Sequence, residues 1–199
     1  MIPTFDQMAG ALQAHGLDVV DCRRLLPRHA TKRYRRRTSA PSGVVFHHSA
    51  GISSSDGLSR VRAVARYTVE QRKCRDGSIG WPGVPYDAIV DPLGVVYLTG
   101  GLDLARYHAG YRGRPGDEND ELMSVCLLGS FAGPHNDSTS EPSLPQMTST
   151  LGTILALRAL FPGWAEEENR GFWTHSDLGK AACPGETIQR MIHAARASR

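Results

Sequence analysis

A histidine and a cysteine near the C-terminus, and a histidine pair far upstream, are the residues of this chain best suited to chemistry. His175 and Cys183 lie eight residues apart, and His47 and His48 end an apolar run that begins at Val44. Two imidazoles and one thiolate form a ligand set that zinc prefers. Three protein ligands leave the fourth tetrahedral position open, so the sequence predicts a catalytic rather than a structural zinc site.

Each of these ligand candidates lies at the end of a predicted element. His47 ends a buried strand, and His175 follows a short strand. Cys183 stands directly before a helix predicted to begin at Pro184, a favoured first-turn residue. A helix N-terminus favours negative charge, so we expect a lowered pKa for the Cys183 thiol. Any one of these residues alone is more often a packed side chain than a ligand, and only the conjunction favours a metal site.

Strand and helix patterns alternate along the chain. Apolar runs predict strands over 17–20, 44–46, 86–90, 94–98, 122–128 and 172–174. Helical spacing predicts helices over 5–15, after a cap at Ser55 or Asp56, over 146–160 and from Pro184. Strands separated by helices, with one hairpin among them, indicate an α/β fold with a central mixed β-sheet flanked by helices.

The helix over 146–160 has an apolar face that we expect to pack inward. Its members are Met147, Leu151, Ile154, Leu155 and Leu157.

The composition is that of an ordinary globular domain. The 199 residues are 40% hydrophobic and 22% charged, and four scattered cysteines are too few for a disulfide framework. No apolar stretch approaches the length of a bilayer span, and the N-terminus shows no secretory signal. We therefore expect that the protein is made in the cytoplasm, and we also expect a monomer.

A basic segment interrupts this composition. Eight Lys or Arg residues and no acid lie between Arg23 and Arg37; the total charge is +3, so the rest of the chain carries −5. Such a run could bind an anionic wall polymer, a membrane surface or nucleic acid. The simpler interpretation is a solvated strap on the surface, and we expect no nucleic acid partner.

Five ordered elements resemble the type 2 N-acetylmuramoyl-L-alanine amidases, a family that includes phage endolysins and the peptidoglycan recognition proteins. The elements are Val44–Gly51, Gly80–Tyr86, Tyr107–Gly110, Ser124–Gly129 and His175 to Gly185. The resemblance runs from about Val44 to the C-terminus. It implies a division into residues 1–40, an N-terminal extension with a helix, a short strand and the basic segment, and residues 41–199, a zinc amidase domain.

The resemblance also implies the ligand roles. His47, His175 and Cys183 match the family's ligands for one Zn²⁺ per chain at the floor of a peptidoglycan-binding groove. His48 then points to the other face of its strand, because neighbouring side chains alternate. An exchange of roles between His47 and His48 stays open.

The family's reaction is hydrolysis of the amide between N-acetylmuramic acid and L-alanine. Tyr86 matches the catalytic tyrosine, with a core tyrosine as the simpler alternative. Many members place Lys or Thr two residues before the third ligand, whereas this chain has Ala181 there and Lys180 one residue earlier. Lys180 is thus a catalytic candidate, and His108 is a candidate either for its role or for substrate binding.

Other side chains match the groove or its supports. Trp81, Tyr107 and Tyr111 could line the groove against sugar or peptide, although Trp81 could also be a core residue. Asp177 could orient a ligand imidazole, or could instead cap the local turn.

Four functions fit this resemblance. The leading hypothesis is a phage or prophage endolysin that acts on the cell wall and causes lysis. A cytosolic amidase that recycles muropeptides is disfavoured, because that branch carries Asp in place of Cys183. A non-catalytic peptidoglycan-binding module is disfavoured because such proteins lose a ligand. A regulatory partner such as an RNA polymerase is left open by the basic segment.

Overall fold

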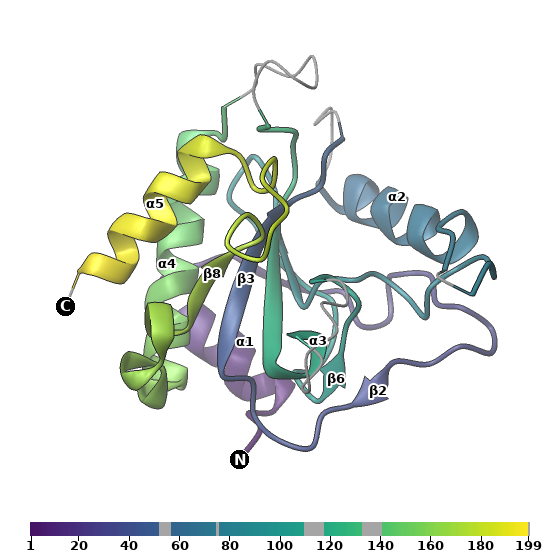
Figure 1. The fold of residues 1–199 in the computed structure, drawn as a ribbon, viewed down its shortest axis with the longest axis horizontal. Coiled ribbons are helices and arrows are strands. Elements are labelled where there is room, and N and C mark those ends of the chain that lie inside the picture. The colour runs from purple at the N-terminus through teal and green to yellow at the C-terminus, as the bar shows by residue number, and fades with distance from the viewer. Residues whose placement is uncertain (52–56, 75, 110–117, 133–140, 199) are drawn as a thin grey trace.

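The computed structural model describes residues 1–51, 57–74, 76–109, 118–132 and 141–198. A six-stranded sheet runs through the middle of the molecule in the order β1-β5-β4-β7-β3-β8 (Figure 1). All neighbouring strands pair in parallel except β4 and β5, which form an antiparallel hairpin. The predicted α/β fold with a mixed sheet is confirmed. The strands are β1 (Val19–Asp21), β3 (Gly43–His48), β4 (Ala88–Val90), β5 (Val96–Leu98), β7 (Leu122–Leu127) and β8 (Phe172–Thr174).

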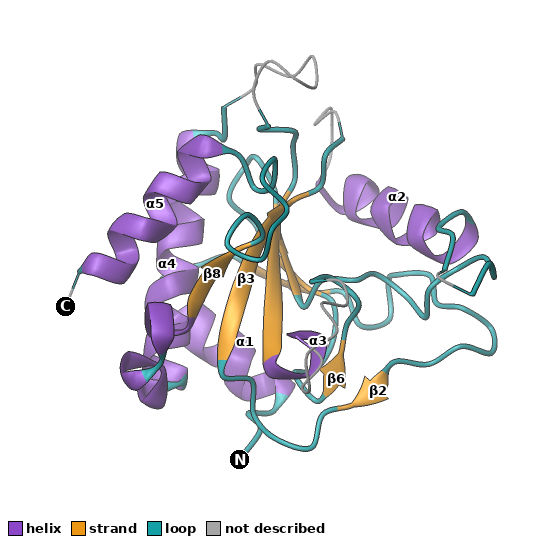
Figure 2. Ribbon diagram, viewed as in Figure 1, coloured by secondary structure: helices purple, strands orange, loops and turns teal. Residues whose placement is uncertain are grey.

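Helices cover both faces of this sheet (Figure 2). The helices α1 (Phe5–Ala14), α4 (Leu144–Leu160) and α5 (Glu186–Ala197) pack on one face, and α2 (Gly57–Glu70) packs on the other. The cap predicted at Ser55 or Asp56 lies outside the described residues. Smaller elements are β2 (Arg35–Arg36), β6 (Leu104–Ala105), α3 (Glu118–Glu121) and two 3₁₀ turns, Pro162–Glu166 and Glu168–Gly171. Within the described part of the chain, no helix combines the length and apolar character that crossing a membrane requires.

The central strand β3 decides which side each histidine faces. It lies between β7 and β8, and all six of its residues are buried. Val44 and Phe46 pack into the core under α1, α4 and α5, whereas Val45 belongs to a separate cluster on the opposite side. Alternation along the strand puts His47 on the same side as Val45, which is the face that α2 covers.

The predicted inward face of α4 is partly wrong. Ile154 and Leu157 are buried as expected, but Leu151 and Leu155 are 43% and 50% exposed. The buried stripe runs instead through polar and small residues, because their side chains find partners inside: the Thr150 hydroxyl donates to the Gln146 carbonyl. The full set is Gln146, Thr150, Thr153, Ile154, Ala156 and Leu157.

The last helix also begins later than predicted. α5 starts at Glu186, so Pro184 precedes the helix and Cys183 belongs to the loop before it. Gly185 makes the transition with φ +101°, and a Cβ there would lie 2.0 Å from the Phe131 carbonyl oxygen. This close approach requires glycine, and it fixes how the Cys183 loop enters the helix.

Residues 1–40 share the core of the rest of the chain. β1 pairs in parallel with β5 at the sheet edge, and Met8 and Leu12 of α1 are buried in the main core cluster. Arg37 is buried too, and its guanidinium donates to the carbonyls of Leu102, Asn119, Asp120 and Leu122. The domain boundary at residue 40 therefore stays a prediction from the family resemblance, and the hydrophobic core is continuous across it.

Candidate metal centre and groove

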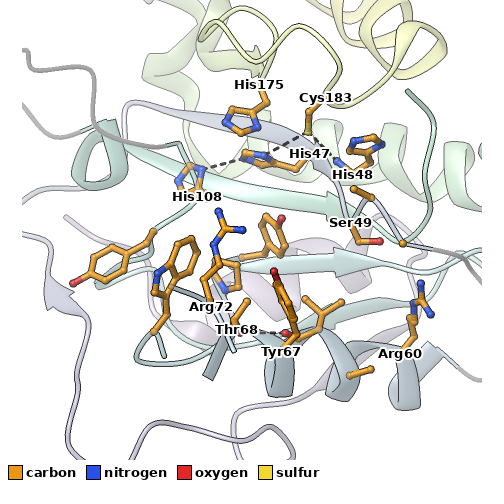
Figure 3. Close-up of a pocket in the computed structure, with 18 residues that line it drawn as sticks. His47, His48, Ser49, Arg60, Tyr67, Thr68, Arg72, His108, His175 and Cys183 are labelled. Carbon is orange, nitrogen blue, oxygen red and sulfur yellow. Dashed lines mark hydrogen bonds between the residues drawn. The ribbon is translucent and has the colours of Figure 1, made fainter. Parts of the chain in front are cut away.

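Three side chains meet at the end of β3 where it leaves the core. His47 comes from β3, His175 from the turn after β8, and Cys183 from the loop before α5. One ligand atom from each lies within 4.8 Å of the other two. Figure 3 shows the two imidazoles and the sulfur facing one another. The loop between His175 and Cys183 is folded back by backbone hydrogen bonds, from Lys180 N–H to the His175 carbonyl and from Cys183 N–H to the Lys180 carbonyl.

A hydrogen-bonded chain sets the tautomer of His47. The Nε2–H of His108 donates to the Leu122 carbonyl at 3.1 Å, so the Nδ1 of that neutral ring is an acceptor. The Nε2–H of His47 then donates to His108 Nδ1 at 3.1 Å, which leaves His47 Nδ1 as a lone pair facing Cys183 Sγ at 3.9 Å. Burial lowers the pKa of both imidazoles, to about 4 for His108, and this keeps them neutral.

His175 has one nitrogen engaged and one without a partner. Its ring hydrogen-bonds to the backbone of Ala109, and burial lowers its pKa to about 4. Its Nε2 is buried and has no hydrogen-bond partner among the described residues. A buried polar atom without a partner is costly unless something else binds it, and a metal-ligating histidine commonly donates its second nitrogen to a carbonyl.

Cys183 lies in a different electrostatic setting from the one predicted. Burial raises the pKa of its thiol to about 12, and the His48 backbone N–H, which donates to Cys183 Sγ at 3.4 Å, opposes this rise. The prediction that a helix N-terminus lowers the pKa of Cys183 is wrong, because α5 begins at Glu186, three residues after the cysteine. A thiolate here needs the positive charge of a bound cation.

These donors fit a zinc ion. Two neutral nitrogens with free lone pairs converge with one sulfur. The second nitrogen of each ring is fixed by a hydrogen bond, and His175 Nε2 has no other partner in the described part of the chain. His48 is not part of this group. Its Nδ1 accepts the Phe131 N–H at 3.0 Å, which supports His47 over His48 as the ligand candidate.

Tyr86 stands beside the three candidate ligands. Its ring centroid is 5.3 Å from that of His47, and its side chain lines the same cavity as the three candidate ligands. Burial raises the pKa of Tyr86 well above its usual value. The hydroxyl therefore stays protonated and is a hydrogen-bond donor at neutral pH.

The candidate ligands open into a groove with a cavity volume of about 570 Å³. Trp81 and Tyr107 line it, and their rings meet edge to face with centroids 6.0 Å apart. His108 also lines the groove, but both its ring nitrogens are engaged within the protein. The predicted groove residue Tyr111 lies outside the described residues.

The opposite wall of the groove comes from α2, which the sequence analysis did not connect with the site. Arg60, Tyr67 and Thr68 of this helix line the cavity, together with Arg72, which lies two residues after its end (Figure 3). The Arg72 guanidinium lies 5.0 Å from the Trp81 ring. No local pattern in the sequence indicated that Arg60 and Arg72 share a groove with the histidines of distant segments.

Two further candidates from the sequence do not enter the groove. Lys180 is exposed and does not line the cavity, although its charge contributes to lowering the pKa of His175. Asp177 accepts the Thr174 N–H at 2.7 Å and pairs with Arg196. Of the two roles considered for Asp177, the structure supports capping of the local turn.

Comparisons with known proteins agree with this fold. A family model described as N-acetylmuramoyl-L-alanine amidase matches residues 37–186. No curated protein matches the chain in sequence.

Solved structures of two lytic enzymes and of a recognition protein are similar. The endolysin N-acetylmuramoyl-L-alanine amidase LysCS from Clostridium intestinale URNW is 16% identical, with 92% of this chain and 97% of that chain covered and a TM-score of 0.54. The Ph2119 endolysin from Thermus scotoductus MAT2119 bacteriophage Ph2119 is 19% identical, with 91% and 99% covered and a TM-score of 0.60. Human PGRP-IBETAC, solved with glycosamyl muramyl pentapeptide, is 18% identical, with 87% and 93% covered and a TM-score of 0.62. At these identities the likeness shows the fold and does not separate enzymes from recognition proteins.

Proposed function

The chain belongs to the N-acetylmuramoyl-L-alanine amidase family, and we propose that it is a zinc-dependent hydrolase of the amide bond between N-acetylmuramic acid and L-alanine in peptidoglycan. The observation that carries this proposal is the complete donor set of His47, His175 and Cys183 at the end of an open groove. We assign the enzyme to the endolysin type, made in the host cytoplasm and acting on the cell wall.

The donor set suits the hydrolysis of an amide. Bound at these three residues, zinc would polarise the amide carbonyl and make water a better nucleophile near neutral pH. Tyr86, protonated and adjacent to His47, would donate a hydrogen bond to the oxygen on which negative charge develops. Lys180, exposed and outside the groove lining, has no support from the geometry for a catalytic role.

The groove walls suit a glycopeptide. Trp81 and Tyr107 offer aromatic faces to sugar rings and peptide. Arg60 of α2 and Arg72 just after this helix offer positive charge to peptide carboxylates. The substrate would therefore lie between α2 and the aromatic residues, with its scissile amide at His47.

A non-catalytic recognition module is the second candidate, because recognition proteins match this fold as well as endolysins do. It would use the same groove without cleavage. A full ligand set with an unpartnered His175 Nε2 favours the enzyme, since a binding module has no need of it.

Purified protein tests both candidates through zinc content and a muropeptide digest. We expect one zinc per chain and release of free stem peptides from the wild type. Cys183→Ala should lose both, whereas Cys74→Ala, a matched change outside the groove lining, should keep both. Tyr86→Phe should keep zinc and lose about 10²–10³-fold in kcat, the typical cost of one oxyanion donor.

The outcomes separate the hypotheses. Zinc without cleavage in the wild type would leave the recognition module as the function. A wild type without zinc, or a Cys183→Ala variant that still cleaves, would refute the proposed metal centre.

A further inference from the structure

A second cavity, of about 460 Å³, lies between the basic segment and the body of the molecule. Residues 26–29, 32–34 and 36 form one side, and Pro82, Gly83 and Val84 contribute to the other. Among the described residues, five Lys or Arg side chains and no Asp or Glu line it. These are Arg28, Lys32, Arg33, Arg36 and Arg106. We propose that this cavity is a binding site for the phosphate groups of a polyol phosphodiester chain, separate from the peptidoglycan groove.

Only part of the positive charge is neutralised within the protein. Arg36 pairs with Asp103 at 2.7 Å, and Arg106 pairs with Asp87 at 3.0 Å. Arg28 and Arg33 have no carboxylate within 4.0 Å in the described part of the chain. The cavity therefore keeps a surplus of at least two positive charges.

The loop that carries these charges is held in place before any ligand arrives. Arg33 Nη1 donates to the carbonyls of His29, Ala30 and Lys32. Lys32 Nζ reaches across to Ser78 Oγ at 2.9 Å and to the Gly80 carbonyl at 2.7 Å. Because the loop is already ordered, binding an anion would cost little further conformational entropy.

Donors remain for a phosphate. Among the described residues, Arg33 forms its hydrogen bonds to the loop through Nη1 alone, so Nε and Nη2 are available as a guanidinium edge. His29 Nδ1 accepts the N–H groups of Thr31 and Lys32 at 3.2 and 3.1 Å. Nδ1 therefore carries no proton, and the ring N–H lies at Nε2, which adds a donor to the lining.

The shape favours a flexible polyol phosphate over two other anions. A bilayer surface is flat and does not enter a concave site, whereas a thin chain can. Nucleic acids rely on aromatic side chains for base stacking. Tyr34, the aromatic side chain among the lining residues, is held by its hydroxyl, which donates to the carbonyls of Gly83 and Val84, and by an edge-to-face contact with Tyr107. Leu26, Pro27 and Pro82 supply apolar walls for the carbon chain.

Calorimetric titration of the full chain with a soluble glycerol phosphate oligomer tests the proposal. We expect saturable binding, and an affinity at least about tenfold weaker in Arg28→Gln/Arg33→Gln, because two charge-assisted donors are lost. The control Arg24→Gln/Arg190→Gln removes the same charge from outside the lining and should change the affinity less than about twofold. Cleavage of a soluble muropeptide should be equal in all three proteins.

Folding checks and competition measurements complete the test. Thermal unfolding measurements check that each variant folds. If the double variant does not fold, the single variant Arg28→Gln, which loses one hydrogen bond to the Arg23 carbonyl, takes its place. Inorganic phosphate should compete with the oligomer, and vesicles of phosphatidylglycerol should bind less well than the oligomer. Equal losses in both double variants, no binding by the wild type, or binding to vesicles alone would each overturn the proposal.

Discussion

His47 and His48 are neighbours in sequence with different surroundings. His47 faces His175 and Cys183, with its ring centroid 4.3 Å from that of His175. The His48 imidazole accepts a backbone N–H from Phe131, and its own backbone N–H donates to Cys183. One residue thus offers its side chain to the candidate metal centre, and the next supports the cysteine through its backbone.

His108 is better explained as a positioning residue than as a substrate-binding one. Both its ring nitrogens are used, toward Leu122 and His47, and its backbone N–H donates to Asn119 Oδ1 at 2.8 Å. Fixing His47 in the Nε2–H tautomer leaves Nδ1 free to bind a metal.

We therefore predict that His108→Ala weakens zinc binding about 10–100-fold, the usual cost of losing such a partner. The measurement is zinc affinity by competition with a chelator, which does not depend on turnover. His108→Asn, whose side-chain oxygen can accept from His47, should recover part of the affinity. Equal zinc affinities in wild type and His108→Ala would contradict the positioning role.

At the scale of the element, α4 shows how polar side chains can take over a buried face. Gln146 is buried, and its Nε2 donates to the carbonyls of Val90 and Leu128, which lie at the ends of two sheet strands. These bonds orient the helix so that Leu151 and Leu155 turn outward. A rule that puts every leucine inside cannot anticipate this rotation.

The rotation predicts unequal effects of identical substitutions on α4. Leu157→Ala, at a fully buried position, should lower the free energy of unfolding by about 2–5 kcal/mol. Leu151→Ala, at a position 43% exposed, should lower it by less than about 1 kcal/mol. Urea unfolding of the two variants measures the difference. Similar losses of unfolding free energy would contradict the outward orientation of Leu151.

At the scale of the whole molecule, the N-terminal forty residues and the family-like remainder form one folded body. α1 packs against α4, β1 completes the sheet edge, and Arg37 bonds to backbone carbonyls around α3 and the start of β7. Much of the basic segment's charge is used inside the protein, as with Arg37, or in ion pairs such as that of Arg36. Deleting residues 1–40 would therefore remove core contacts along with charge.

A core substitution in α1 tests this unity. Leu12→Ala should lower the free energy of unfolding of the whole chain by about 2–5 kcal/mol, in a single cooperative transition. Leu25→Ala, in the basic segment and 39% exposed, is the matched control with an expected loss below about 1 kcal/mol. Urea unfolding followed by tryptophan fluorescence reports on both, and two separate transitions would show that the N-terminal region is an independent unit.

The sequence alone determined the fold class, the family and the residue types of the metal centre. Apolar runs and helical spacing are local properties, so they predicted β3, β7, β8 and the hairpin, and motif order identified His47, His175 and Cys183 as candidates. Only the tertiary structure decided what depends on contacts between distant segments. Four features depend on packing and hydrogen bonding between distant segments, which no local pattern encodes. They are the hydrogen bond that fixes the His47 tautomer through His108, the groove wall formed by α2 and Arg72, the outward orientation of Leu151, and the cavity beside Arg33.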